Sequence, residues 1–134
     1  MANADRIRIL TINAGSSSLK AAIYDIDRTE RLMFVVQVER IGRSGSQMRI
    51  IDGDRITVLD RTVDLDDHVT AARGFLEWLE LHRPEAAPNA VGHRIVHGGR
   101  THRAPHVLTA DLLTDLQMTL LMTYCGSAFE AWCT

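Results

Sequence analysis

Alternating hydrophobic and polar residues dominate the first sixty positions and predict a β-sheet. Residues 6–12, RIRILTI, alternate Arg and Ile and then become fully apolar, as a strand does when it enters a core. Similar segments follow, and the strands are expected at residues 6–12, 19–25, 31–41, 48–52 and 55–60. Short turns rich in Gly, Ser and Asp separate them, so we predict antiparallel hairpins.

The period of the apolar residues changes to that of a helix after residue 65. Asp66 is the expected N-cap, and Pro84 lies just beyond the expected end of the helix. The apolar positions that recur at helical spacing are Val69, Ala72, Leu76 and Leu79.

Strand character returns at residues 90–96, AVGHRIV, and a second helix is expected after Thr109. Its apolar positions would be Leu112, Leu113 and Leu116. The predicted order is β-β-β-β-β-α-β-α, which is an α/β fold with an antiparallel start.

Length and charge exclude several classes of protein. The chain has 134 residues, a net charge of −2, 46% hydrophobic and 24% charged residues, which fits one globular domain and excludes a disordered or collagen-like chain. A general nucleic-acid binder would carry a basic excess, so no nucleic-acid partner is expected. The apolar runs are too short for a membrane span and the start does not resemble a signal peptide, so we expect no membrane partner and a cytoplasmic location.

A Gly/Ser-rich loop, residues 13–20 (NAGSSSLK), follows the first predicted strand. Such a loop offers backbone N–H groups and hydroxyls to an anion, and Lys20, the only lysine of the chain, adds a positive charge. The side-chain oxygen of Asn13 suits a hydrated Mg²⁺. The segment is not a Walker A loop, because a strand follows it, and an ordinary polar hairpin turn remains the alternative.

The second dense motif is residues 92–99, GHRIVHGG. His93 and His97 have the spacing of a helical metal pair, but on a strand they would lie roughly 13 Å apart, too far to share one ion. A site that adds His102 and His106 remains open. Arg94 is either a bidentate clamp for an anion or a solvated arginine on a sheet.

Taken together, the two motifs resemble the signatures of the acetokinase family. These are N-x-G-S-S-S-x-K after a hydrophobic strand and G-H-R-I/V-V-H-G-G further along, and both occur here in the family's order, with a likeness that covers about residues 6–117. The resemblance implies a ribonuclease H-like fold of the sugar kinase/actin/Hsp70 superfamily, present here as an incomplete N-terminal domain. It also implies phosphoryl transfer from ATP to acetate, which gives acetyl phosphate and ADP.

The resemblance also implies roles for single residues. Asn13 would be linked to Mg²⁺ or Mn²⁺, and Arg94 would bind the carboxylate beside Val96, which would contact the methyl group. On the nucleotide side, Ser16, Ser18 and Lys20 would approach the phosphates of ATP. His93 and His97 would have only packing or hydrogen-bonding roles.

Family members are homodimers roughly three times as long as this chain, so a separate chain of this length is expected to be inactive. Propionate and butyrate kinases share much of the pattern, and a non-catalytic nucleotide- or anion-binding fragment is a further alternative.

The domain prediction is residues 1–117 as a partial acetate-kinase-like domain and residues 118–134 as an atypical tail. At 24% charged residues, about four are expected in that tail, but it holds only Glu130, together with both cysteines. A frameshift or truncation after about residue 117 would explain this composition, and a genuine apolar C-terminal helix is the alternative.

Overall fold

The structure is a computed structural model that describes residues 6–94, 104, 105, 107 and 109. Every helix and strand described below belongs to the first of two units of the chain, residues Met1–Arg94. Val96 and His97 lie outside the described residues, as do residues 110–116 of the predicted second helix.

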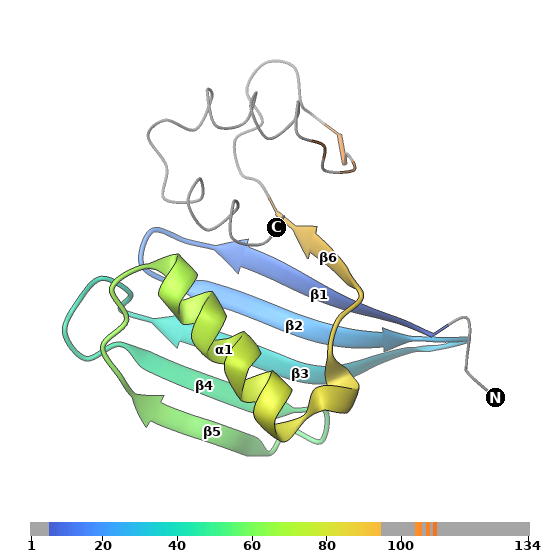
Figure 1. The fold of residues 1–134 in the computed structure, drawn as a ribbon, viewed down its shortest axis with the longest axis horizontal. Helices are drawn as coiled ribbons and strands as arrows, with labels where there is room; N and C mark the ends of the chain where they lie inside the picture. Colours follow the sequence, from blue (N-terminus) through green and yellow to red (C-terminus); the bar gives the residue numbers. More distant parts are fainter. Residues whose placement is uncertain (1–5, 95–103, 106, 108, 110–134) are drawn as a thin grey trace. The chain divides into compact units, whose positions relative to one another are not determined.

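A six-stranded sheet and one long helix form the described unit (Figure 1). The elements are β1 (Ile7–Ala14), β2 (Leu19–Ile26), β3 (Glu30–Glu39), β4 (Gln47–Asp52), β5 (Thr57–Thr62), α1 (His68–His82), the 3₁₀ turn η1 (Pro84–Ala86) and β6 (Ala90–His93). The strand order is β5-β4-β3-β2-β1-β6, and β1 to β5 pair antiparallel with their neighbours in sequence. The five strands and the antiparallel start predicted from the alternation are therefore confirmed.

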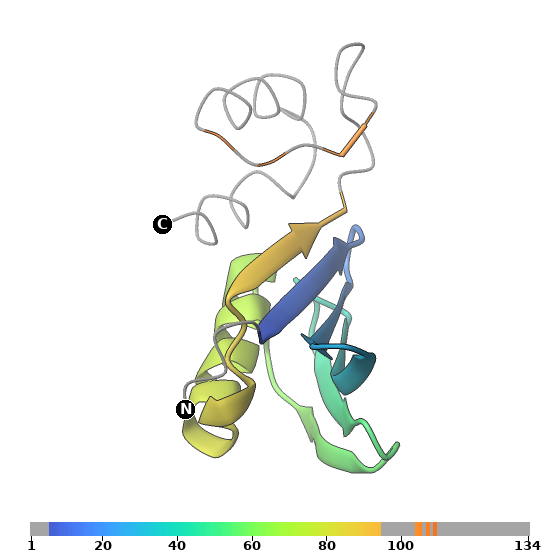
Figure 2. The same ribbon diagram turned by 90° about the vertical axis from the view of Figure 1, so that its right-hand side faces the viewer.

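The last strand returns to the opposite edge of the sheet. After β5 the chain crosses one face of the sheet as α1 and then adds β6 parallel to β1 (Figures 1 and 2). The register pairs Ile12 with His93, and the Arg94 N–H donates to the Ile12 carbonyl at 3.0 Å. The strand expected at residues 90–96 is found at Ala90–His93, and its last two positions lie outside the described residues.

The core lies between the sheet and α1. Successive side chains of a strand point to opposite faces, so the buried residues of β1 to β4 alternate with more exposed ones. Fully buried side chains in this layer include Leu10, Leu19, Ile23, Val36, Val38, Met48, Ile50 and, from the helix, Phe75. Each such side chain contributes about 1.5–3 kcal/mol when it leaves water, so this layer holds α1 against the sheet.

Two predictions about α1 need correction. The N-cap is Asp67 and not Asp66, because the Asp67 carboxylate accepts the Thr70 N–H at 2.7 Å. The buried face comprises His68, Ala71, Ala72, Phe75 and Leu79, whereas Val69 and Leu76 of the predicted set are half-buried. The face is shifted because the Phe75 ring occupies its centre and because a polar residue, His68, is buried at its start.

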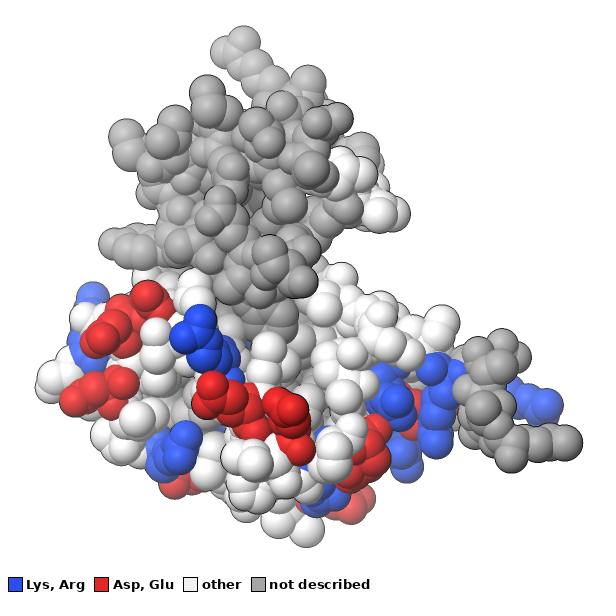
Figure 3. All heavy atoms as spheres, in the orientation of Figure 1, with Lys and Arg blue, Asp and Glu red and all other residues white. Residues whose placement is uncertain are grey.

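Charge is mixed on the face of the molecule that carries α1. Acidic and basic side chains lie interspersed over the side of the molecule that carries α1 (Figure 3). None of the helices in the described residues is long and apolar enough to span a membrane.

Replacing Asp67 by Ala is expected to lower the free energy of unfolding by about 1 kcal/mol, because the Thr70 N–H loses its acceptor. Asp66→Ala is the matched control and should change it by less than about 0.5 kcal/mol, as expected for an exposed residue outside the cap. Urea denaturation followed by circular dichroism measures both values. Equal losses in the two variants would contradict the assignment of the cap.

The same hydrogen bond from the Thr70 N–H holds the pKa of Asp67 below its ordinary value. A lowered folded-state pKa means that the contribution of the cap is present above the unfolded pKa of about 3.9 and is lost as pH falls through the folded pKa. The difference between wild type and Asp67→Ala should therefore shrink in acid.

Candidate functional site

The Gly/Ser loop closes the hairpin between β1 and β2. The Gly15 N–H donates to the Ser18 carbonyl at 2.9 Å, which brings the two ends of the loop together. A Cβ atom at residue 15 would lie 2.6 Å from the Ser18 hydroxyl, so a side chain there would displace that hydroxyl. A residue with a Cβ atom at position 15 would therefore require only that the Ser18 hydroxyl move.

Two contacts from distant parts of the chain support this loop. The Ile41 N–H donates to the Ser17 carbonyl at 2.9 Å. From the first turn of α1, the Nε2 atom of His68 lies 2.7 Å from the Gly15 carbonyl oxygen and 3.1 Å from that of Ser18. His68 is only 4% exposed. Sequence reasoning missed this residue because nothing in the local pattern links it to a loop fifty positions earlier.

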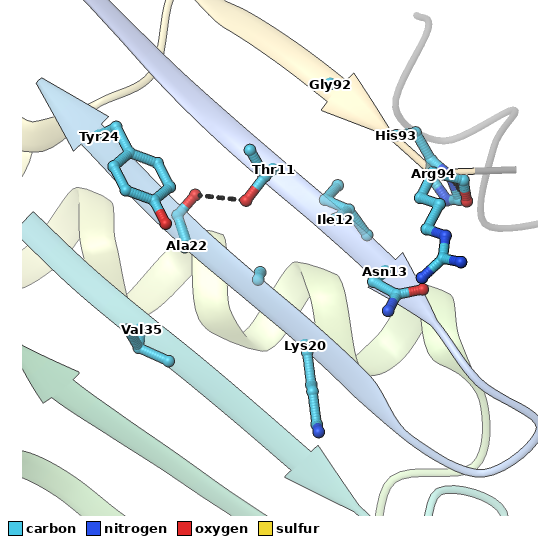
Figure 4. Close-up of a pocket in the computed structure, with 11 residues that line it drawn as sticks. Thr11, Ile12, Asn13, Lys20, Ala22, Tyr24, Val35, Gly92, His93 and Arg94 are labelled. Atoms are coloured by element: carbon cyan, nitrogen blue, oxygen red, sulfur yellow. Dashed lines mark hydrogen bonds between the residues drawn. The ribbon is translucent and has the colours of Figure 1, made fainter. Parts of the chain in front are cut away.

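Asn13, Lys20 and Arg94 come together on the sheet face opposite α1 (Figure 4). Asn13 and Lys20 are directly paired across β1 and β2, so their side chains are neighbours on one face. The parallel register of β6 with β1 carries Arg94 to the position beside Asn13, and Figure 4 shows its guanidinium group directed toward Asn13. All three side chains are exposed.

These residues line an open pocket of about 510 Å³. Its lining combines two cations, Lys20 and Arg94, with the amide of Asn13 and the apolar side chains of Ala22 and Val35. No carboxylate occurs among the described residues that line it. A hollow with two positive charges and no acidic group suits an anionic ligand.

His93 is among the residues that line this pocket, although its pairing with Ile12 places its side chain on the helix-covered face of the sheet. Its Nδ1 atom is 2.8 Å from the Arg94 carbonyl oxygen, and because a carbonyl only accepts, Nδ1 carries the hydrogen. Burial lowers the pKa of His93, and the hydrogen bond to the Arg94 carbonyl partly offsets this. The imidazole is thus neutral at pH 7, and the positive charge of the pocket comes from Lys20 and Arg94.

The other candidate residues either lie away from the pocket or fall outside the described residues. Ser16 and Ser18 lie in the loop directly after β1, and neither lines the pocket. Val96, His97, His102 and His106 lie outside the described residues. Within the described part of the chain, no cluster of three or more His, Cys, Asp or Glu side chains could hold a metal ion.

Two solved structures superpose on most of this chain and define its fold. The Porphyromonas gingivalis acetate kinase superposes with a TM-score of 0.76 at 21% identity, covering 93% of this chain and 33% of that one. A propionate kinase from Francisella tularensis gives 0.71 at 22% identity, covering 86% and 29%. The described unit therefore has the ribonuclease H-like fold of these kinases, of which the chain covers only part.

Sequence comparison is more specific. The model of the acetokinase family matches residues 8–122, and the chain belongs to this family. It is 37% identical over 112 residues to an acetate kinase of Clavibacter michiganensis and 36% identical over 115 residues to one of Streptomyces avermitilis. These matches cover 81% and 82% of this chain but only 27% and 28% of the relatives, so the chain spans a little over a quarter of their length.

The lowered pKa of His93 predicts a pH dependence of stability. A histidine whose folded-state pKa is lowered contributes stability above the unfolded pKa of about 6.5, and this contribution is lost as pH falls below that value. We expect the free energy of unfolding to fall more steeply between pH 7.5 and 5.5 in the wild type than in His93→Asn. The amide of Asn can still donate to the Arg94 carbonyl, but it does not titrate.

Urea denaturation at a series of pH values measures this difference. Parallel curves for the two proteins would show that His93 titrates with the same pKa in the folded and unfolded states.

Proposed function

We propose that this chain supplies the carboxylate-binding and part of the nucleotide-binding apparatus of an acetate kinase, which transfers a phosphoryl group from ATP to acetate. The observation that carries the proposal is the convergence of Asn13, Lys20 and Arg94 in one pocket without an acidic group, in a chain of the acetokinase family. Asn13 and Lys20 come from β1 and β2, and Arg94 directly follows β6, so the pocket depends on the tertiary structure.

Arg94 is the proposed acetate ligand. Its guanidinium group can donate two parallel hydrogen bonds to a carboxylate, which fixes the orientation of a substrate with only one methyl group. Val96, two residues further along, is proposed to contact that methyl group. The oxygen of acetate that attacks the phosphorus is one of the two carboxylate oxygens proposed to be bound by Arg94. The contact with Arg94 would therefore both hold acetate and orient its attacking oxygen.

Lys20, Ser16 and Ser18 are proposed to approach the phosphates of ATP. The loop that carries the two serines begins beside Asn13 and ends at Lys20, so one short segment presents hydroxyls, N–H groups and an ammonium group. The amide oxygen of Asn13 is an exposed hard donor of the type that Mg²⁺ or Mn²⁺ binds directly or through water. Such an ion would neutralise charge on the transferred phosphoryl group when bound.

The reaction itself requires mainly positioning and charge stabilisation. A carboxylate oxygen of acetate forms a bond to the γ-phosphorus of ATP, and the bond from that phosphorus to the bridging oxygen breaks, leaving acetyl phosphate and ADP. This chain is proposed to hold the carboxylate and the phosphates close together. Because it spans a little over a quarter of its relatives, we expect it to bind ligands without appreciable turnover on its own.

Two alternatives remain within this proposal. The likeness to a propionate kinase structure makes a longer carboxylate a second candidate substrate. A non-catalytic nucleotide- or anion-binding role is the second alternative. The acetokinase resemblance further supports a cytoplasmic homodimer as the working form of the complete enzyme.

Arg94→Ala is expected to weaken acetate binding to the chain roughly tenfold to a hundredfold, the effect of losing about 1.5–3 kcal/mol of charge-assisted hydrogen bonding. Arg61→Ala is the matched control, because Arg61 is exposed on β5 at the opposite edge of the same sheet. Titration of the labelled chain with acetate, propionate and butyrate, followed by nuclear magnetic resonance, measures the affinities. Tighter binding of propionate or butyrate would favour the longer substrate, and equal acetate binding by Arg94→Ala and Arg61→Ala would remove Arg94 from the site.

Lys20→Ala is expected to reduce the affinity for MgATP by a similar factor, because the phosphates lose their ammonium partner. Calorimetry of the wild type, Lys20→Ala and Arg61→Ala measures this effect, and a coupled ATP/acetate assay on the same samples measures turnover. Binding without turnover agrees with the proposal. If the wild type binds neither MgATP nor acetate, the proposed ligand-binding role is wrong.

A further inference from the structure

A buried histidine joins the start of α1 to the loop between β1 and β2. His68 is 4% exposed, and its Nε2 atom contacts the carbonyl oxygens of Gly15 and Ser18, the first and last residues of that loop. Histidine is costly to bury unless its ring nitrogens are hydrogen-bonded, so these contacts account for a polar residue in the layer between the sheet and the helix.

The atoms involved determine which group donates in the hydrogen bond between His68 and the loop. Both partners are carbonyl oxygens, which only accept, so Nε2 carries the hydrogen and donates to the two oxygens in a three-centre hydrogen bond. The Ser18 oxygen also accepts the Gly15 N–H at 2.9 Å. The histidine therefore binds the loop at the point where its two ends already meet.

The contact between His68 and the loop carbonyls also fixes the direction of the N–H groups of the loop, because of the geometry of the peptide bond. The described peptide bonds are all trans, and in a trans peptide the C=O and the following N–H point in opposite directions. With the Gly15 carbonyl turned toward His68, the Ser16 N–H points away from the helix. In the same way the Ser17 carbonyl, held by the Ile41 N–H, directs the Ser18 N–H away from residue 41.

We propose that His68 is a positioning residue that holds the Gly15–Ser18 loop in the orientation in which its N–H groups are presented to the phosphates of a nucleotide. The inference rests on the proposed function, since it assigns the loop to the phosphate side of that site. His68 itself does not touch the ligand. It acts through the backbone of Gly15 and Ser18, and preorganised donors bind an anion without first having to be ordered.

The test uses two substitutions at residue 68 and one control on the same helix. Gln can place an N–H donor near the position of Nε2, whereas Leu fills the space without a donor. His82 lies at the exposed C-terminal end of α1, where its Nδ1 atom contacts the Trp78 carbonyl. His82→Leu therefore removes a histidine from the same helix without touching the loop.

Two measurements are made on the 134-residue chain after circular dichroism has shown that each variant is folded. The first is hydrogen exchange of the Gly15 amide without ligand, and the second is calorimetric affinity for MgATP. We expect His68→Leu to speed exchange and to weaken MgATP binding about tenfold each, the size of one or two lost hydrogen bonds. His68→Gln should recover most of both effects, and His82→Leu should match the wild type.

Wild-type loop exchange and wild-type affinity in folded His68→Leu would overturn the proposal. Faster loop exchange with unchanged MgATP affinity would also overturn it, because the loop would then be held by His68 without serving the ligand. Equal changes in Gly15 exchange and MgATP affinity in His68→Gln and His68→Leu would also overturn it, because an N–H donor near the position of Nε2 would then have no effect on the loop.

A separate readout covers the case in which His68→Leu does not fold. In the wild-type chain labelled with ¹⁵N-histidine, the His68 Nε2–H should give a slowly exchanging resonance with contacts to the Gly15–Ser18 loop, and its absence would overturn the proposal. If the wild type shows this resonance but does not bind MgATP, the proposed function fails and the ligand role of His68 fails with it. If the resonance is absent and MgATP binds, only the role of His68 is wrong.

Discussion

The parallel pairing of β6 with β1 is the interaction on which the candidate site depends. The two motifs are separated by about eighty residues, and they meet only because β6 adds to the free edge of β1 in a register that sets His93 opposite Ile12. The Arg94 N–H bond to the Ile12 carbonyl continues that register by one residue and brings Arg94 beside Asn13. A shift of one residue would turn Arg94 to the helix-covered face, because strand side chains alternate between the two faces.

The crossover through α1 makes this pairing possible. An antiparallel meander ends at β5, the edge strand furthest from β1, and the chain must cross the whole sheet to reach the other edge. The helix makes that crossing over the apolar face, where Ala71, Phe75 and Leu79 bury the layer beneath it. The opposite face carries Asn13, Lys20 and Arg94, so the two faces of one sheet separate the part that stabilises the fold from the candidate site.

In the Gly/Ser loop, groups that stabilise the fold and residues of the candidate site lie within a few residues of each other. Its carbonyls are turned inward to His68 and Ile41, while its serine side chains occupy the end of the hairpin. The start of α1 thus does more than cover the core, since the helix that closes the apolar layer also supports the loop. The adjacent residue, Asp67, caps the helix. Two neighbouring polar residues thus have different roles, since Asp67 accepts a helix N–H and His68 contacts the loop.

The sequence by itself determined the strands, their antiparallel start and the family, because alternation is read locally and the two motifs are short and contiguous. It placed the N-cap one residue early, because adjacent aspartates at residues 66 and 67 are equivalent in a pattern. It predicted the buried face of the helix only in part, because packing against the sheet decides which helix residues are buried. It identified Asn13, Lys20 and Arg94 singly. Only the tertiary structure brought them into one pocket and joined His68 to Gly15, since strand register and contacts across fifty residues follow from how the elements pack and not from local preference.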